Sequence, residues 1–426
     1  MLGRFINTIK QIFTLPDLRN RILYAMALLL VARVLAHVPL PGVDLEALRN
    51  FFSRNQIFGL FNMFSGGAMS NFSIIMMGVG PYITSSIIIQ LLTMVIPALD
   101  ELNKEGESGR AKINYWTRIF TVPLALVQSY SMIRILQSQQ ILGGLESMQW
   151  AVILISITAG TMLLMWLGEL ISENGIGNGV SLIIALGIVA GIPGQIRNTA
   201  QIIDTSAIIS LAIFAVIGIG VIALIVLANE GMRQIPVSYA RRIRGMRSYG
   251  GVETHLPIRV NSAGVIPIIF AMSIMIFPGV IAKFFQNAHS AWLANTATFV
   301  NNLFQNGWFQ GVFYFVLVVL FTFFYTGVIL KPTDMAENLQ KQGGFIPGIR
   351  PGKETTDYLG RVIMRITLSG AIFLGIIAVM PYIVQAVTHI NTIVIGGTGV
   401  LIMVSVIIET MRQIQAQLVM RSYENY

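Results

Sequence analysis

Long apolar segments alternate with short polar or Gly/Pro-rich segments along almost the whole chain. A helix needs roughly 20 mainly apolar residues to cross a hydrocarbon core about 30 Å thick. Ten segments meet this requirement, near residues 22–39, 74–97, 117–137, 150–172, 178–195, 207–229, 261–284, 309–330, 363–385 and 392–411. Open sheets cannot span lipid, and these segments are too long and too uniformly apolar for a β-barrel. The pattern therefore predicts an all-α integral membrane protein with ten transmembrane helices.

Two shorter apolar segments do not fit this series. Residues 2–14 alternate apolar and polar positions with a helical period, which predicts a helix on the membrane surface that ends at Pro16. Residues 58–72 are apolar and aromatic but too short to span, and Gly66 and Gly67 interrupt them. Such a segment should lie in the interface, pack on the bundle, or re-enter the membrane where protein surrounds its backbone.

Composition supports a membrane protein and removes several chemistries. Of the 426 residues, 54% are hydrophobic and 11% are charged, whereas soluble domains carry about a quarter charged residues. The chain has no cysteine, which excludes disulfides, thiolate metal sites and thiol nucleophiles.

The basic residues are distributed unevenly between the two sides of the ten predicted spans. The side that holds both termini carries 22 of the 28 lysines and arginines, the opposite side carries five, and Arg33 falls inside the first span. Because cytoplasmic loops carry an excess of Lys and Arg, both termini are expected in the cytoplasm.

Two cytoplasmic loops, at about 230–260 and 331–361, are larger than this orientation requires. The first contains ARRIRGMR (240–247) and the second GFIPGIRPGKET (344–355). These charges could serve orientation alone, or they could form a docking surface for a cytoplasmic partner, including one that offers RNA phosphates.

Residues for catalysis, metal binding or ion coupling are scarce in the predicted spans. Glu169 and Glu409 lie near the cytoplasmic ends of their helices, and no histidine pair has the spacing of a helical metal site. The run GIRPGKET fails as a nucleotide-binding loop, because Pro347 and Glu354 stand where that motif needs Gly and Ser or Thr. We therefore expect no enzyme activity, no cofactor and no metal, with energy supplied from outside the chain.

Several longer runs resemble the bacterial SecY family, and together they cover essentially the whole chain in order. They are LFNMFSGGAMS (60–70), GPYITSSIIIQLL (80–92), NKEGESGRAK (103–112), MWLGELISENGIGNG (165–179), THLPIRVNSAGVIPIIF (254–270) and GFIPGIRPGKET (344–355). This family forms the central subunit of the Sec protein-conducting channel.

The resemblance implies a fold of two inverted, pseudo-symmetric halves of five spans each. The N-terminal half would comprise residues 1–200, with the surface helix and a re-entrant plug helix at about 60–71. The C-terminal half would comprise residues 201–426, with both large cytoplasmic loops. Inverted repeats of this kind recur among membrane transport proteins.

The resemblance also implies roles for individual positions. The family's pore is a ring of aliphatic side chains, which falls here on Val79, Ile83, Val180, Ile184, Ile269 and Ile402. The plug would include Phe61, Phe64, Gly66 and Gly67. Polar positions of the lateral gate match Thr84, Gln90 and Asn261. The family positions that dock SecA or the ribosome correspond here to Arg241, Arg242, Arg244, Arg247 and Arg350.

The function that the resemblance implies is a gated channel in the bacterial plasma (inner) membrane. It would translocate unfolded secretory polypeptides and release transmembrane segments sideways into the lipid bilayer. The implied partners are SecE, SecG, SecA, the ribosome, signal peptides and nascent secretory or membrane proteins. The alternative is a multi-pass secondary transporter of a small solute, which would need a coupling-ion site that the sparse intramembrane charges do not offer.

Overall fold

The computed structural model describes residues 15–41, 43–54, 59, 62, 65–143, 146–200, 207–239, 242–244, 247–249, 253–285, 290–388 and 397–424. The chain folds into two compact units. Unit 1 comprises Met1–Ser210 together with Ile390–Tyr426, and unit 2 comprises Leu211–His389. The predicted surface helix at residues 2–14 lies outside the described residues.

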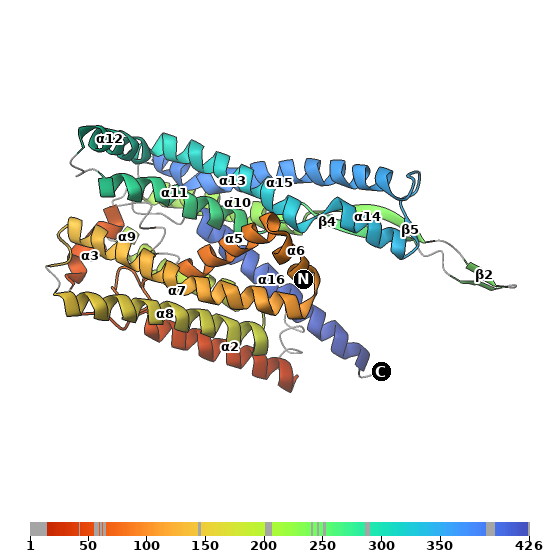
Figure 1. Cartoon of the computed structure of the whole chain (residues 1–426), viewed down its shortest axis with the longest axis horizontal. Coiled ribbons are helices and arrows are strands. Elements are labelled where there is room, and N and C mark those ends of the chain that lie inside the picture. Colours follow the sequence, from red (N-terminus) through yellow and green to blue (C-terminus); the bar gives the residue numbers. More distant parts are fainter. Residues whose placement is uncertain are drawn as a thin grey trace. The chain divides into compact units, whose positions relative to one another are not determined.

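Unit 1 consists mainly of helices in its described part (Figure 1). Its helices are α2 (Pro16–Leu35), α3 (Leu45–Arg54), α5 (Gly80–Val95), α6 (Pro97–Lys104), α7 (Glu107–Ser138), α8 (Ser147–Asn174), α9 (Gly179–Ala200) and α16 (Gly397–Glu424). Helix α2 packs on α8, α7 packs on both α5 and α8, and α9 packs on both α8 and α16.

Small residues bring the backbones of α8 and α9 together. A Cβ atom at Gly168 would lie 3.0 Å from Cγ2 of Val180, and one at Gly179 would collide with the carbonyl of Gly168. Glycines at such crossings let membrane helices approach closely, where dispersion contacts replace the hydrophobic effect as the source of stability. The contact fixes the start of α9 against the end of α8.

Unit 2 contains α10 (Ala207–Glu230), α11 (Ile266–Phe285), α12 (Ala291–Gln305), α13 (Gly307–Ile329), α14 (Pro332–Lys341) and α15 (Lys353–Thr388). Helices α13 and α15 lie side by side, and α11 packs on α13 (Figure 1). Phe270 of α11 forms edge-to-face contacts with Phe321 and Tyr325 of α13.

Unit 2 also contains strands, which the expectation of an all-helical chain did not include. They are β1 (Met232–Tyr239), β2 (Arg242–Arg244), β3 (Arg247–Tyr249), β4 (Glu253–Arg259) and β5 (Gly344–Phe345). The first, fourth and fifth form an antiparallel sheet in the order β4-β1-β5, while β2 and β3 form a separate hairpin. They lie in the predicted cytoplasmic loops, where water satisfies sheet edges, so the exclusion of open sheets from lipid does not apply.

Five of the described helical segments are long and apolar enough to cross a membrane: Glu107–Gln137, Ser147–Asn174, Gly307–Lys341, Lys353–Ile383 and Thr398–Met420. A sixth is added if α5 and α6, which bend by 103° at Ile96, count as one span. Shorter apolar stretches lie in α9, α10 and α11. The chain is thus a multi-pass membrane protein. Each of the ten predicted segments contains a helix, and the count of ten spans remains a prediction.

Some predicted boundaries were wrong. The second predicted span begins at 74, but the chain makes turns until α5 starts at Gly80, and Pro97 begins a separate helix. Helix α7 begins ten residues before the predicted 117, because helical geometry continues through charged residues that hydropathy alone assigns to a loop. Helix α15 starts ten residues before the predicted 363 for the same reason.

Candidate functional site

Five of the six predicted ring residues belong to unit 1. Val79 directly precedes α5 and is buried, and Ile83 follows one helical turn later, with its amide donating to the Val79 carbonyl at 3.0 Å. Val180 and Ile184 have the same i, i+4 spacing on α9. Residues four apart lie on one face of a helix, so each pair presents two aliphatic side chains in line.

The remaining ring positions lie on α16 and α11. Ile402 of α16 is 1% exposed and Ile184 of α9 is 4% exposed, and these two helices are packed neighbours. Ile269 belongs to α11 in unit 2, where its carbonyl accepts a hydrogen bond from the Ser273 hydroxyl at 2.9 Å. Unit 1 therefore brings buried aliphatic side chains onto adjacent helices, and closure of a six-membered ring remains a prediction.

The chain between α2 and α5 is packed rather than exposed. Residues 65–79, which we call the turn segment, form successive turns, and Ala68, Phe72 and Met76 are fully buried. The Phe72 carbonyl accepts from the Leu40 amide at 2.8 Å, and the Ile74 amide donates to the Val38 carbonyl at 3.1 Å. This short bridge attaches the turn segment to the chain that follows α2.

The turn segment contains part of the predicted plug at 60–71. Phe61 and Phe64 lie outside the described residues, whereas Gly66 and Gly67 adopt left-handed conformations with φ of 68° and 81°. Residues with side chains rarely adopt this conformation, and two in succession interrupt a regular helix. From Ser65 onward the plug is therefore a series of turns rather than the continuous helix that was predicted.

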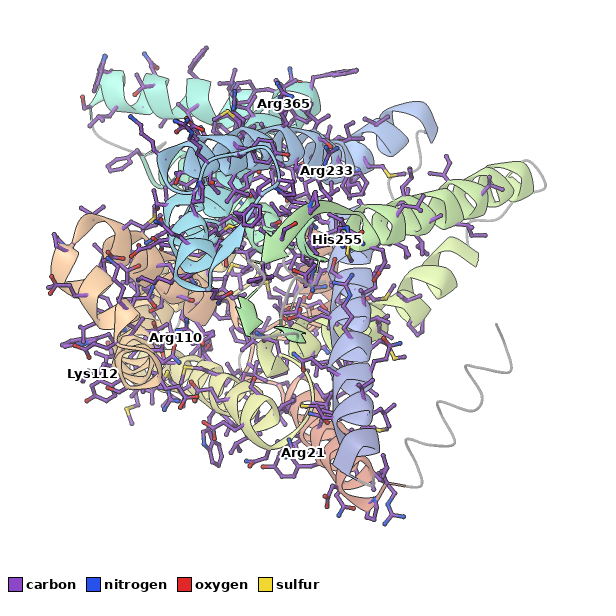
Figure 2. The ribbon with its side chains drawn as sticks, turned by 90° about the vertical axis from the view of Figure 1, so that its right-hand side faces the viewer. Arg21, Arg110, Lys112, Arg233, His255 and Arg365 are labelled. Atoms are coloured by element: carbon purple, nitrogen blue, oxygen red, sulfur yellow. The ribbon has the colours of Figure 1, made fainter. Side chains whose placement is uncertain are left out.

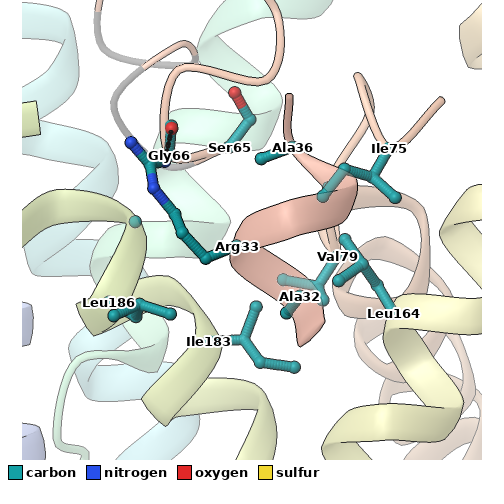
Figure 3. A pocket seen from close by; sticks show the side chains of 12 residues that line it. Ala32, Arg33, Ala36, Ser65, Gly66, Ile75, Val79, Leu164, Ile183 and Leu186 are labelled. Carbon is teal, nitrogen blue, oxygen red and sulfur yellow. Dashed lines mark hydrogen bonds between the residues drawn. The ribbon is translucent and has the colours of Figure 1, made fainter. Parts of the chain in front are cut away.

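Arg33 of α2 reaches into the turn segment. Its Nη1 donates a hydrogen bond to the Gly66 carbonyl at 2.6 Å. The two residues line a small cavity of about 30 Å³ that is also bordered by Ser65, Val79 and Ile183 (Figure 3). The cavity thus joins α2, the turn segment, the first residue of the predicted ring, and α9.

The apolar pattern predicts that Arg33 lies inside the first span, without a role. A signal was available, because a lone arginine in an apolar helix is a functional candidate by default. Its acceptor could not be found in the sequence, since the partner is a backbone carbonyl 33 residues away.

The predicted gate residues each have a partner within their own unit. The Thr84 hydroxyl donates to the Gly80 carbonyl at 3.0 Å and accepts from Gln128 Nε2 at 3.4 Å. Gln90 donates to the hydroxyl of Ser86 at 3.3 Å. Pairing among the three gate positions remains a prediction.

Asn261 differs from the other two gate positions. Its Nδ2 donates to Oδ1 of Asn229 at 2.8 Å, whereas its own Oδ1 is buried and has no hydrogen-bond partner in the described part of the chain. A buried acceptor without a donor is unfavourable by about 1–3 kcal/mol.

The two predicted docking loops form one structure. Strand β1, from the first loop, pairs with β5, from the second, through Ser238 opposite Phe345 and Tyr239 opposite Gly344. A common core lies beneath the sheet, formed by Ile235, Val237, Ile258, Ala336, Leu339, Ile346, Leu359 and Ile363.

The predicted docking arginines are placed along these loops. Arg350 is exposed between β5 and α15, and its carbonyl accepts a hydrogen bond from the Thr355 hydroxyl at 2.8 Å. Arg242, Arg244 and Arg247 lie in the β2–β3 hairpin. Arg241 lies outside the described residues.

Comparison with known proteins decides the family. A profile of the SecY family matches residues 73–411. The chain belongs to the SecY family. Two similar relatives, each named protein translocase subunit SecY, come from Halalkalibacterium halodurans and Streptomyces coelicolor. The first is 40% identical over 434 residues, which cover 98% of this chain and 99% of the relative. The second is 40% identical over 439 residues, covering 97% and 98%.

Solved structures share the SecY fold. A structure described as a protein conducting channel aligns with a TM-score of 0.63 at 20% identity, over 93% of this chain and 91% of the other. Sec61 in a canine ribosome–channel complex from the endoplasmic reticulum aligns with a TM-score of 0.61 at 19% identity, with the same coverage. The predicted family and the predicted helical membrane fold are therefore confirmed.

Proposed function

We propose that this SecY-family protein is the gated channel through which unfolded polypeptides cross the bacterial plasma membrane. It also releases transmembrane segments sideways into lipid. The observation that carries the proposal is the position of the turn segment directly before α5. It places Gly66 and Val79 around one small cavity, next to a helix that carries Ile184. A channel of this kind needs a plug that can move, next to a constriction formed by aliphatic side chains.

The aliphatic side chains account for both the seal and the passage. A hydrophobic constriction resists wetting and so blocks ions. The side chains of Ile184 and Ile402 have no hydrogen-bonding group. They therefore form no specific bonds to an extended polypeptide and can move aside for any sequence. The same positions that exclude ions can thus admit a chain without selecting it.

The sheet in unit 2 supplies the docking surface in this proposal. Arg350 stands beside the sheet, and the arginine-bearing β2–β3 hairpin follows β1. Arginine suits either partner, SecA or the ribosome, because its planar fork binds carboxylate or phosphate in bidentate fashion. SecE and SecG would complete the translocase, and signal peptides and nascent chains would be its substrates.

Both termini lie in the cytoplasm in this proposal. In unit 1, Arg21 lies in the first turns of α2 and Arg110 and Lys112 lie in the first turns of α7 (Figure 2). In unit 2, Arg233 of β1 and Arg365 of α15 lie on the side that carries the sheet (Figure 2). Such basic ends are expected on the cytoplasmic face.

The experiment uses the absence of native cysteines. One cysteine replaces Ile184, which is 4% exposed, and a matched control replaces Val189, which is 46% exposed on the same helix. Each variant is reconstituted with SecE and SecA, and a secretory polypeptide that carries its own cysteine is stalled in transit. We expect an Ile184→Cys disulfide that requires ATP and a working signal sequence, and none with Val189→Cys. A stalled polypeptide that reacts with neither variant, nor with Ile83→Cys, would place the conducting path elsewhere.

A further inference from the structure

We propose that Arg33, through its hydrogen bond to the Gly66 carbonyl, holds the turn segment in place in the resting channel. We call this residue the catch. In this inference, which rests on the proposed function, one guanidinium–carbonyl hydrogen bond inside the membrane keeps the turn segment in its closed position. The bond breaks when the channel opens. The catch is a positioning residue, because it acts through the turn segment and not on the translocated polypeptide.

The geometry favours a strong single contact. Arg33 Nη1 donates to the Gly66 carbonyl oxygen at 2.6 Å, and a hydrogen bond with one ionised partner is stronger than one between neutral groups. Arg33 lies in the last turn of α2, a helix that packs on α8 and α9 and is therefore fixed in unit 1. The donor is thus anchored, while the acceptor belongs to a segment built of turns.

Gly66 is suited to this contact by its lack of a side chain. A Cβ atom there would lie 2.9 Å from Cα of Gly187 on α9 and 3.6 Å from Nη1 of Arg33. Its φ of 68° also turns its peptide into a conformation that side chains rarely allow. Glycine therefore permits the turn segment to touch α9 and to present its carbonyl to the arginine together.

A second arginine offers a natural control. Arg49 of α3 donates to Oδ1 of Asn71 at 3.3 Å, and Nδ2 of Asn71 contacts the Ala36 carbonyl at 3.5 Å. This contact is longer, is exposed to water and joins two side chains. Exposed contacts of this kind contribute little, so the two arginines that contact the turn segment should have different effects when replaced.

The surroundings of Arg33 explain how the catch would release. Arg33 is partly buried beside a small, mainly apolar cavity, where a charge without an acceptor is unfavourable. Once the pore fills with water or with a polypeptide, other acceptors replace the Gly66 carbonyl. The hydrogen bond between Arg33 and Gly66 is therefore strong in the closed channel, where water is excluded, and weak in the open channel, where water enters. Closure and the exclusion of water then favour each other.

The test compares ion leak in proteoliposomes that contain the full translocase with no substrate present. Arg33→Met replaces the arginine with a shorter, unbranched side chain that has no donors, Arg49→Gln is the control, and Ile83→Asn tests the ring itself. Loss of one charged hydrogen bond should raise the released fraction, and with it the leak, by roughly tenfold or more. Arg49→Gln should leak like the unsubstituted channel. Arg33→Met should also translocate substrates with defective signal sequences, which a merely destabilised chain would not do.

Each outcome separates the catch from the channel. If Arg33→Met stays tight while Ile83→Asn leaks, the catch is refuted and the proposed function stands. If no variant leaks and no polypeptide is translocated, the proposed function itself has failed. If Arg33→Met does not insert into the membrane, Gly66→Ala decides. It retains the arginine, but its Cβ would lie 2.9 Å from Cα of Gly187 and its φ of 68° disfavours a side chain, so the Gly66 carbonyl must move away from Arg33. A tight Gly66→Ala channel would overturn the proposal.

Discussion

Arg33 and Arg118 both lie on helices of unit 1, but they meet different acceptors. Arg33 donates to a backbone carbonyl in the turn segment at 2.6 Å. Arg118 of α7 donates through Nε to the carboxylate of Glu169 on α8 at 2.7 Å. The first acceptor belongs to a series of turns, and the second to a helix of 28 residues. Arg118 therefore cross-links two fixed helices, whereas Arg33 holds an element that can leave.

The two acceptors differ in charge. This difference explains why the Arg118–Glu169 contact suits a permanent connection between helices and the Arg33–Gly66 contact suits a reversible one. Breaking the pair of Arg118 and Glu169 strands two charges, one of them on a side chain that is only 17% exposed. Breaking the contact of Arg33 and Gly66 strands one charge, and only until water reaches it. The same donor thus forms a lasting connection with a carboxylate and a reversible one with a carbonyl.

The largest effect should come from breaking the ion pair at one end. Arg118→Met leaves the mostly buried Glu169 carboxylate without its partner, and should lower the free energy of unfolding by about 2 kcal/mol, since Arg118 itself is 44% exposed. Thermal unfolding in detergent measures this loss. The ion leak should not change. A leaking but thermally unaltered variant would reverse the assignment of the two arginines.

Exchanging the two charges should recover most of that stability. Arg118→Glu combined with Glu169→Arg restores opposite charges on α7 and α8, and should unfold within about 1 kcal/mol of the unsubstituted protein. Both single replacements serve as references in the same unfolding assay. A double variant that is no more stable than either single one would mean that packing, and not charge, joins these helices. No such exchange exists for Arg33, because its acceptor is backbone.

A conservative replacement of the catch should have a smaller effect. Arg33→Lys keeps one charged donor but loses the planar fork, so the resting leak should rise only about threefold. Conductance of single channels in planar bilayers resolves a change of this size. A leak as large as that of Arg33→Met would show that geometry, rather than charge, controls release.

Salt should produce the smallest effect and should distinguish the two contacts. Raising ionic strength from 0.1 to 1 M shortens the screening length from about 10 to about 3 Å, which weakens exposed charge pairs. The half-exposed pair of Arg118 and Glu169 should lose about 0.5 kcal/mol, measured as the salt dependence of unfolding in Arg118→Met against the unsubstituted chain. The ratio of the leak of Arg33→Met to that of the unsubstituted channel, which cancels the higher conductance of the stronger electrolyte, should be unaffected by salt. Equal salt sensitivity of both readouts would contradict the partly buried position of the contact between Arg33 and Gly66.

The sequence predicted those parts of the structure that depend on uniform physical rules. Apolar length places a helix in every predicted span, because lipid leaves the backbone no alternative. It did not predict the sheet, since β1 has only two buried positions, Ile235 and Val237, whose burial depends on α14 and α15. The bend between α5 and α6 was not predicted from the sequence either, although Pro97 stands directly after it.

The candidate site divides in the same way. The aliphatic positions Val79 and Ile184 follow from resemblance, and the structure buries both in unit 1. The contact of Arg33 could not be predicted, because a backbone carbonyl leaves no residue type to search for. Its partner is identified only when the path of the turns between α2 and α5 is known.

The three-stranded sheet has a consequence for how relatives can exchange parts. Since β1 comes from one loop and β5 from the other, a chimera that takes only the first loop from a relative must still match Phe345 and Gly344 across the pairing. It must also fill a core to which Leu339 and Leu359 contribute from the second loop. The two loops therefore form one structural module, and a change at the shared pairing or core in either loop should require a matching change in the other.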